Sequence, residues 1–267
     1  MFALAQPESI SFSIIEPKFS PLEKTIFYQL GENKIPITIL QYGDVKDVVY
    51  INVHDDETTS VEAAKSILEI NGGILIKIEN NHRRNIRFRF RNNFYAFDAN
   101  RIFSRQGIEQ TLNINGRISK PAINEIEKFA QRLLQLIPDS TSCIVALHNN
   151  TNGAFSINSY LAGHERQFDA RAVYADSNED IDDIALTTDS LIYQKMADYR
   201  YNTIWQHNEK AKKDGSLSIY CGERNLRYIN IETEHGKLNQ HIQMLQKLML
   251  ILAETTKRSS EKNEDLD

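Results

Sequence analysis

Val48-Val49-Tyr50-Ile51-Asn52-Val53-His54-Asp55-Asp56-Glu57 is the stretch of sequence that decides the fold. It begins with apolar and β-branched residues, which predict a buried strand, and it ends abruptly in a histidine and three carboxylates. Loops at strand ends are where α/β proteins usually place their chemistry, so these polar residues mark a candidate site. His54 and Glu57 have the spacing H-x-x-E, which lets both side chains bind one metal ion at ~2.0–2.2 Å. The same spacing also arises by chance at solvated strand ends, so a third ligand and a catalytic base are needed to support a metal site.

The segments on either side predict strands that alternate with helices. Upstream, Pro36–Tyr42 predicts a strand. Downstream, Thr59 and Glu62 have the spacing of a capping box, which predicts the start of a helix that Gly72-Gly73 would end. A strand over Ile74–Ile78 follows. We therefore expect an α/β fold with a mixed, largely parallel central sheet and helices on both faces.

The second half of the chain continues the same alternation, with a polar middle. Residues 149–183 are rich in Asn, Ser, Gly and Asp, which predicts long loops around the site. The predicted elements are helices over Pro121–Leu136, Thr188–Trp205 and His241–Leu252, and strands over Cys143–His148, Leu217–Tyr220 and Tyr228–Ile231.

We expect one catalytic domain over residues 18–254, preceded by an N-terminal arm over residues 1–17. Residues 255–267 are charged and almost without apolar side chains, which predicts a disordered tail. Met1–Gln6 has the small-residue spacing of a signal-peptidase site, but it lacks the charged and apolar regions of a leader, which favours a plain arm.

The composition is that of an ordinary globular protein: 267 residues, 41% hydrophobic and 25% charged. A net charge of −5 argues against a nucleic-acid binder that relies on a basic surface, and no apolar run approaches the ~20 residues that span a bilayer. Cys143 and Cys221 are too few for a disulfide framework or a cysteine-based zinc site. We expect a soluble cytoplasmic protein, or a periplasmic one if an upstream signal peptide has been removed.

Two apolar strands each end in a histidine, at Val53-His54 and at Leu147-His148. Because ligands bind at the carboxyl ends of strands in open α/β sheets, both imidazoles would meet at one edge. His54, Glu57 and His148 would then form a site for one Zn²⁺ per chain with a position left open, which is the pattern of catalytic rather than structural zinc. The alternative for His148 is a hydrogen bond to a neighbouring loop.

A hydrolase also needs a group that moves protons, and the predicted strand from Tyr228 supplies two candidates. Glu232 lies near the end of this strand, where partial burial would raise the pKa of its carboxyl. Glu234 follows on the same strand face and competes for the role. An exposed edge strand with both carboxylates in water is the alternative.

Basic residues between the two halves suggest substrate contacts. Asn100 and Arg101 offer an amide and a guanidinium fork suited to a substrate carboxylate. Upstream, Arg89 or Arg91 would stabilise the oxyanion of a tetrahedral intermediate.

The alternative for this basic segment is a hairpin with solvated arginines, which we expect for Arg83, Arg84 and Arg87. Phenylalanines in the same segment, at positions 88, 90 and 94, also allow an RNA-stacking interpretation, which the acidic composition disfavours.

The ordered series of H-x-x-E at 54–57, Asp-x-Asn-Arg at 98–101, a strand-end histidine at 148 and a strand-borne glutamate at 232 resembles the zinc carboxypeptidase superfamily. In motif style it is closest to the succinylglutamate desuccinylase/aspartoacylase branch, whose Asp-Leu-Asn-Arg-x-Phe motif is close to Asp98–Phe103. The match covers residues 48–236 as ordered landmarks. The chain departs from the pattern in lacking a glycine after His54, in the Thr-Glu-His-Gly after Glu232, and in a long stretch between 148 and 232.

The resemblance implies a zinc carboxypeptidase-like fold and a role for each landmark. His54, Glu57 and His148 would bind zinc, and Glu232 would be the general acid/base. Asn100 and Arg101 would hold a substrate carboxylate, and Arg91 or Arg89 would polarise the scissile carbonyl.

We therefore expect a zinc-dependent hydrolase that cleaves an amide bond adjacent to a free carboxylate, in a small peptide or an acyl amino acid. The departures leave the substrate open, and with it the choice of Glu232 over Glu234. The alternative is a catalytically inactive protein that binds a metal or a carboxylate ligand on the same scaffold. A nucleic-acid or membrane partner is not expected.

Overall fold

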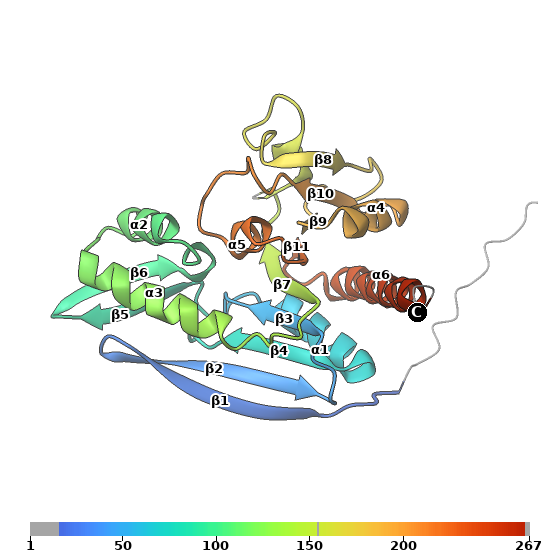
Figure 1. The fold of residues 1–267 in the computed structure, drawn as a ribbon. Helices are drawn as coiled ribbons and strands as arrows, with labels where there is room; N and C mark the ends of the chain where they lie inside the picture. Colours follow the sequence, from blue (N-terminus) through green and yellow to red (C-terminus); the bar gives the residue numbers. More distant parts are fainter. Residues whose placement is uncertain (1–15, 154, 265–267) are drawn as a thin grey trace, which may run out of the picture.

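A mixed sheet of nine strands runs through the described part of the protein, residues 16–153 and 155–264 of a computed structural model (Figure 1). The strand order is β1-β2-β4-β3-β7-β11-β9-β10-β8, and a separate two-stranded hairpin pairs β5 with β6. The central strands β4, β3, β7 and β11 are parallel to one another. On one flank β2 and β1 are antiparallel to their neighbours, and on the other β9 is antiparallel to β11 but parallel to β10, which pairs antiparallel with β8. The strands are β1 (Pro21–Leu30), β2 (Asn33–Tyr42), β3 (Val48–Asn52), β4 (Gly73–Ile78), β5 (Asn85–Phe90), β6 (Asn93–Asp98), β7 (Cys143–Asn150), β8 (Ala170–Tyr174), β9 (Ile184–Thr187), β10 (Asn202–Gln206) and β11 (Tyr228–Glu234).

Helices cover both faces of this sheet, which confirms the predicted fold class. Helices α1, α4 and α6 pack with Tyr50 and Val145 on one face, whereas α2, α3 and α5 pack with Val49 and Ile144 on the other. Every residue of β3 is buried, because both of its faces are covered. The helices are α1 (Thr58–Asn71), α2 (Arg105–Ile114), α3 (Lys120–Leu134), α4 (Ser190–Asp198), α5 (Leu217–Glu223) and α6 (Leu238–Glu264), with short 3₁₀ turns η1 (Ala99–Arg101) and η2 (Ile157–Tyr160).

Helix α1 begins differently from the sequence prediction. The predicted capping box of Thr59 and Glu62 is wrong, because the N-cap is Glu57, two residues before Thr59, and no side chain caps the helix from that position. The Ser60 N–H donates to Asn149 Oδ1 at 3.0 Å, so a side chain from β7 satisfies one of the free amides of the first turn. The helix ends before Gly72 at φ +75°, as predicted.

Two other predicted elements are wrong. The helix predicted over Thr188–Trp205 is two elements, α4 and then β10, because Arg200 has a left-handed φ of +69° that ends the helix. The strand predicted at Leu217–Tyr220 is the start of α5. A short apolar run of this kind has no period that separates a strand from a buried helix.

The structure also contains elements that the sequence did not predict. Residues 149–183, predicted as loops, contain η2 and β8, and α2 had no predicted counterpart. Helix α6 continues to Glu264, through most of the segment predicted to be a disordered tail. Residues 1–15 and 265–267 lie outside the described residues, so the signal-peptidase motif and nearly all of the predicted arm are not described. Among the described helices, none combines the length and apolar character needed to cross a bilayer.

His241 on α6 makes the stability of the fold depend on pH. Its side chain is fully buried, with Nδ1 2.9 Å from Thr233 Oγ1. Burial, reinforced by the nearby His148, lowers the pKa of His241 to about 3. Between pH ~6.5 and 3 the unfolded chain therefore binds a proton that the folded chain does not, and stability falls as the pH falls.

We expect the free energy of unfolding to decrease more steeply below pH 6.5 in the wild type than in His241→Gln, which cannot take up that proton. Urea unfolding between pH 4 and 8 measures both curves. Parallel curves would contradict the assigned role of His241.

Candidate metal centre

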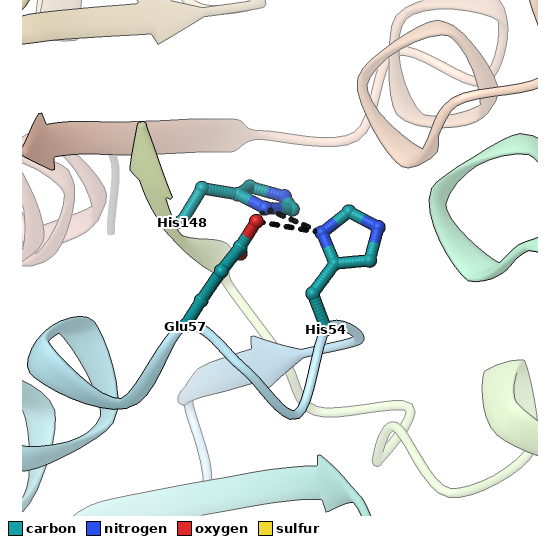
Figure 2. Close-up of side chains that lie close together, drawn as sticks. All are labelled: His54, Glu57 and His148. Atoms are coloured by element: carbon teal, nitrogen blue, oxygen red, sulfur yellow. Dashed lines mark hydrogen bonds and ion pairs between the residues drawn. The ribbon is translucent and has the colours of Figure 1, made fainter. Parts of the chain in front are cut away.

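Three buried side chains meet at the carboxyl end of the parallel strands (Figure 2). His54 follows β3 by two residues, Glu57 immediately precedes α1, and His148 lies on β7. His54 Nδ1 is 2.9 Å from Glu57 Oε1, and His148 Nδ1 is 2.7 Å from Glu57 Oε2. The structure thus brings together the three ligands that the sequence predicted, although two of them are 94 positions apart.

The arrangement has the dimensions of a tetrahedral zinc site. Two donors at ~2.0–2.2 Å from one zinc ion lie about 3.3–3.6 Å apart. The Nδ1 atoms of His54 and His148 are 3.3 Å apart, and the nitrogen–oxygen pairs are only slightly closer. Shifts of a few tenths of an ångström would therefore admit the ion, so the residues present fit a metal with imidazole and carboxylate ligands.

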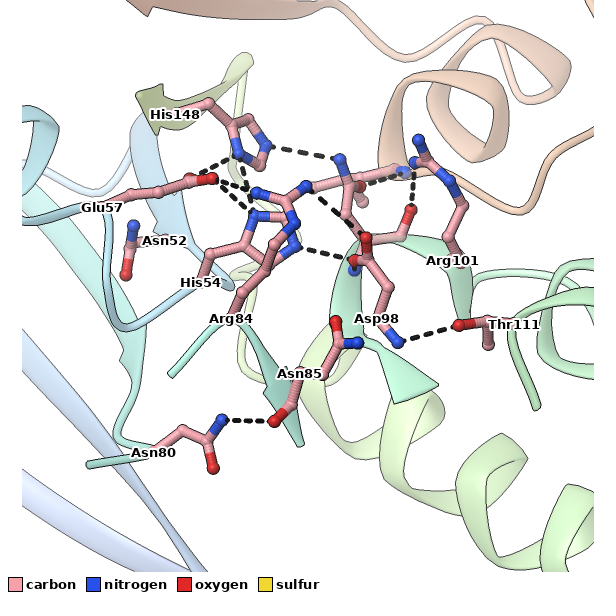
Figure 3. A network of polar contacts seen from close by, with 12 residues as sticks. Asn52, His54, Glu57, Asn80, Arg84, Asn85, Asp98, Arg101, Thr111 and His148 are labelled. Carbon is pink, nitrogen blue, oxygen red and sulfur yellow. Dashed lines mark hydrogen bonds and ion pairs between the residues drawn. The ribbon is translucent and has the colours of Figure 1, made fainter. Parts of the chain in front are cut away.

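A second layer of contacts orients the two imidazoles (Figure 3). Asp98 Oδ1 lies 2.7 Å from His54 Nε2. A carboxylate in this position is the usual partner that orients a metal-binding histidine in zinc sites. Asn100 Nδ2 lies 3.3 Å from His148 Nε2, while Asn100 Oδ1 accepts a hydrogen bond from the Leu217 N–H at 3.0 Å. Both ends of the Asn100 side-chain amide are thus engaged within the protein, at a position that lines the cavity described below.

Charge is closely balanced at this centre. Burial opposes the charged form of His54, but the carboxylates of Glu57 and Asp98 outweigh it and raise the pKa of His54 to about 9. Burial likewise opposes ionisation of Glu57 and Asp98, yet their histidine partners hold the pKa of both carboxyls well below the usual range. Both carboxylates are therefore ionised at neutral pH.

Arg84 is a site residue that the sequence analysis missed. We predicted a solvated side chain, but Arg84 Nη1 lies 2.6 Å from Glu57 Oε1 and Nη2 lies 3.4 Å from Asp98 Oδ2. The turn before it is held by Asp55, whose Oδ2 accepts the Asn80 and His82 backbone N–H groups at 2.7 and 2.8 Å. Spacing in the sequence does not reveal that this turn folds back onto the strand end.

The structure does not bring Arg89 or Arg91 to the centre. Both lie at the far end of the β5–β6 hairpin, where Arg89 Nε is 3.5 Å from Glu32 Oε2 and Arg91 stacks over the Phe90 ring at 5.3 Å. The alternating pattern of a strand does not predict which arginine of a basic hairpin lies near a site. That depends on how the hairpin packs against the rest of the protein.

A cavity of about 320 Å³ opens beside the three ligands. Glu57, His148, Glu232, Asn100 and Arg101 line it, together with Arg84, Arg166, Phe155, Tyr160, Asp214 and Tyr228. Arg166 is another residue that the sequence analysis missed, because it lies in an irregular loop without a motif. Its guanidinium stacks over Phe155 at 5.6 Å and over Tyr160 at 5.9 Å.

The structure separates Glu232 from Glu234. Glu232 pairs in register with His148 across β11 and β7 and lines the cavity, whereas Glu234 lies two residues further along and contacts Lys237. Burial raises the pKa of the Glu232 carboxyl, and Glu57 adds to the effect, while His148 and a 3.0 Å hydrogen bond from Asn230 oppose it. Of the two carboxyls, Glu232 is therefore the one that lines the cavity beside His148.

Arg101 lines the cavity but is partly engaged. Its Nη1 donates to the Asn100 carbonyl at 2.7 Å, and its Nη2 lies 3.7 Å from Asp214 Oδ2. These partners occupy part of the guanidinium. Because Arg101 also lines the cavity, it remains a candidate for contact with a substrate.

Comparisons with known proteins find similar folds only. No family model and no curated protein matches the sequence. Similar solved structures include an aspartoacylase family protein from Mesorhizobium loti, at 13% identity and TM-score 0.45, over 90% of this chain and 71% of that one. Another is the murein-tripeptide amidase MpaA from Escherichia coli O157, at 11% identity and TM-score 0.43, over 85% of this chain and 91% of that one. A third is the Legionella pneumophila aminopeptidase LapA, at 12% identity and TM-score 0.37, over 86% of this chain and 57% of that one.

The chain spans a little over half the length of LapA. Identities of 11–13% leave the function to be inferred from the side chains of the site.

The Asp98 contact gives a prediction that is independent of any substrate. Asp98→Asn removes the charge that accepts the His54 Nε2–H, and we expect zinc affinity to fall ~10–100-fold, as outer-shell changes typically cause. Competition with a chromogenic zinc chelator measures this affinity, with the exposed Asp139→Asn as the matched control. Equal affinity in Asp98→Asn and the wild type would contradict the role of Asp98.

Proposed function

We propose that the protein is a zinc-dependent hydrolase that cleaves an amide bond adjacent to a free carboxylate. The observation that carries this proposal is the meeting of His54, Glu57 and His148 beside a cavity that also holds the carboxyl of Glu232. Three protein ligands leave one position of a tetrahedral ion open, as in catalytic zinc sites. We propose one zinc ion per chain.

A zinc ion held there would supply a Lewis acid, which makes water acidic enough to react at neutral pH and polarises a carbonyl. The chain's own contribution is proton transfer by Glu232. Its carboxylate accepts the proton of the water whose oxygen bonds to the carbonyl carbon. It then delivers that proton to the nitrogen as the carbon–nitrogen bond breaks, releasing a carboxylic acid and an amine.

Arginine side chains support a substrate that carries a carboxylate. Arg84 takes the place that we had predicted for Arg91, since its guanidinium lies at the cavity wall next to Glu57 and can stabilise negative charge on the carbonyl oxygen. Arg101 and Arg166 line the same cavity and are suited to gripping a carboxylate. The substrate class that fits is a short peptide or an acyl amino acid with a free carboxylate.

One observation favours the alternative of a ligand-binding protein without catalysis. The Arg84 guanidinium already lies 2.6 Å from a Glu57 oxygen, so a fixed positive charge sits beside a proposed metal ligand. A site neutralised in this way could bind an anionic ligand without turnover. The two experiments below separate the possibilities.

Metal content is the first test. Elemental analysis of the purified wild type should give about one zinc per chain, and His54→Ala and His148→Ala should each lose it, because two ligands alone bind zinc weakly. The exposed His164→Ala is the matched control and should retain the ion. A wild type that carries no zinc and cannot be loaded with it would refute the hydrolase.

Turnover is the second test. On a panel of N-acyl amino acids and short peptides, Glu232→Gln should keep its zinc but lose roughly 10²–10⁴-fold in kcat, the usual size of a general acid–base contribution. Glu23→Gln on the exposed strand β1 is the control. If the wild type is as inert as Glu232→Gln across the panel while both bind zinc, the ligand-binding alternative gains.

A further inference from the structure

A second group of oxygens lies beyond the metal centre, at the carboxyl end of β11. Ligand-capable oxygens of Asp180, Asp182 and Glu234 lie within 4.8 Å of one another. Asp180 and Asp182 belong to the segment that leads into β9, and Glu234 pairs in register with Asn150 on β7. The group therefore lies where the segment before β9 meets the end of β11, next to β7.

Some of these oxygens are buried without a donor. Asp182 is 1% exposed; its Oδ2 accepts the Gly153 N–H, but its Oδ1 has no hydrogen-bond partner among the described residues. Asn150 Oδ1 is likewise buried and without a partner in the described part of the chain, while its Nδ2 donates to the Asp182 carbonyl at 2.7 Å. A buried carboxylate oxygen with no donor is costly, so an unmet Asp182 Oδ1 points to a missing positive partner.

Lys237 satisfies only part of this group. Its ammonium lies 2.7 Å from Asp180 Oδ2, 3.4 Å from Asp183 Oδ1 and 3.5 Å from Glu234 Oε1. Three carboxylates thus surround one ammonium, and the described contacts of Lys237 do not include Asp182. Negative charge remains in excess at the buried end of the group.

We propose that Asp180, Asp182 and Glu234 bind a hard divalent cation of the calcium type, separate from the zinc centre. The donors are all oxygens, which suit calcium or magnesium rather than zinc. Calcium tolerates irregular geometry and takes 6–8 oxygens at ~2.3–2.6 Å, which accommodates carboxylates from a loop and a strand together with a nearby amide oxygen such as Asn150 Oδ1.

The cation would act on the wall of the catalytic cavity. Asn150 and Thr151 line that cavity, and Asn150 is hydrogen-bonded to Asp182 and paired with Glu234. A cation shared by Asp182 and Glu234 would fasten this wall to β9 and β11. It would stiffen the cavity without touching the reacting atoms.

The test is a calcium titration of the full-length protein, stripped of metal and then reloaded with one zinc per chain. Calcium should raise the Tm by several degrees at about 100 times its Kd, as for any ligand that binds only the folded state. Sodium chloride at equal ionic strength should not. Asp182→Asn should weaken calcium binding at least tenfold, whereas the exposed Asp139→Asn should leave it unchanged.

Lys237→Met separates the cation from the lysine. If calcium shares the site with the ammonium, removing the ammonium should tighten calcium binding severalfold. If Lys237 is the sole counter-ion, the variant will lose stability and gain no affinity, which overturns the proposal. A wild type whose Tm does not respond to calcium also overturns it.

Two further variants guard against misfolding and test whether the calcium site is separate from the zinc centre. Glu234→Gln replaces Asp182→Asn if the latter does not fold, with the same expected loss of calcium affinity. His54→Ala should retain the calcium response; its loss would place calcium at the zinc centre and refute a separate site.

Discussion

The parallel pairing of β3 with β7 is the constraint on which the site depends. Ile51 pairs in register with Ala146, so His54 and His148, three and two residues further along, emerge at the same edge of the sheet. Glu57 closes the arrangement because the turn from His54, with the Glu57 N–H 3.1 Å from the His54 carbonyl, carries its carboxylate back between the imidazoles. A carboxylate that is 2% exposed is tolerated there because histidine and arginine partners neutralise it.

Charge then organises the surroundings. Asp98 orients His54 from β6, and Arg84 bridges Asp98 and Glu57 from the segment before β5. That segment passes through left-handed backbone at Asn81 and His82, at φ +51° and +53°, a conformation that is unfavourable for residues other than glycine. The hydrogen bonds from this turn to Asp55 compensate for the strain and hold Arg84 at the centre.

The carboxyl end of β11 places two carboxylates in different surroundings within three residues. Glu232 lines the cavity beside His148, where burial raises the pKa of its carboxyl. Glu234, one strand repeat further on, meets Asp180 and Lys237 at the edge of the sheet. Asn150 connects these two regions, because it lines the cavity and pairs in register with Glu234.

The sequence by itself determined the alternation of strands and helices, the candidate ligands His54, Glu57 and His148, and Glu232 as a candidate base. These were predictable because they rest on local signals: apolar runs that end in polar residues, and residue types that zinc prefers. Only the tertiary structure decided that Arg84 rather than Arg91 reaches the centre, that Arg166 lines the cavity, and that Leu217–Tyr220 is helical. These features depend on how a hairpin, a loop and a short apolar segment pack against distant residues, and no local period in the sequence records such packing.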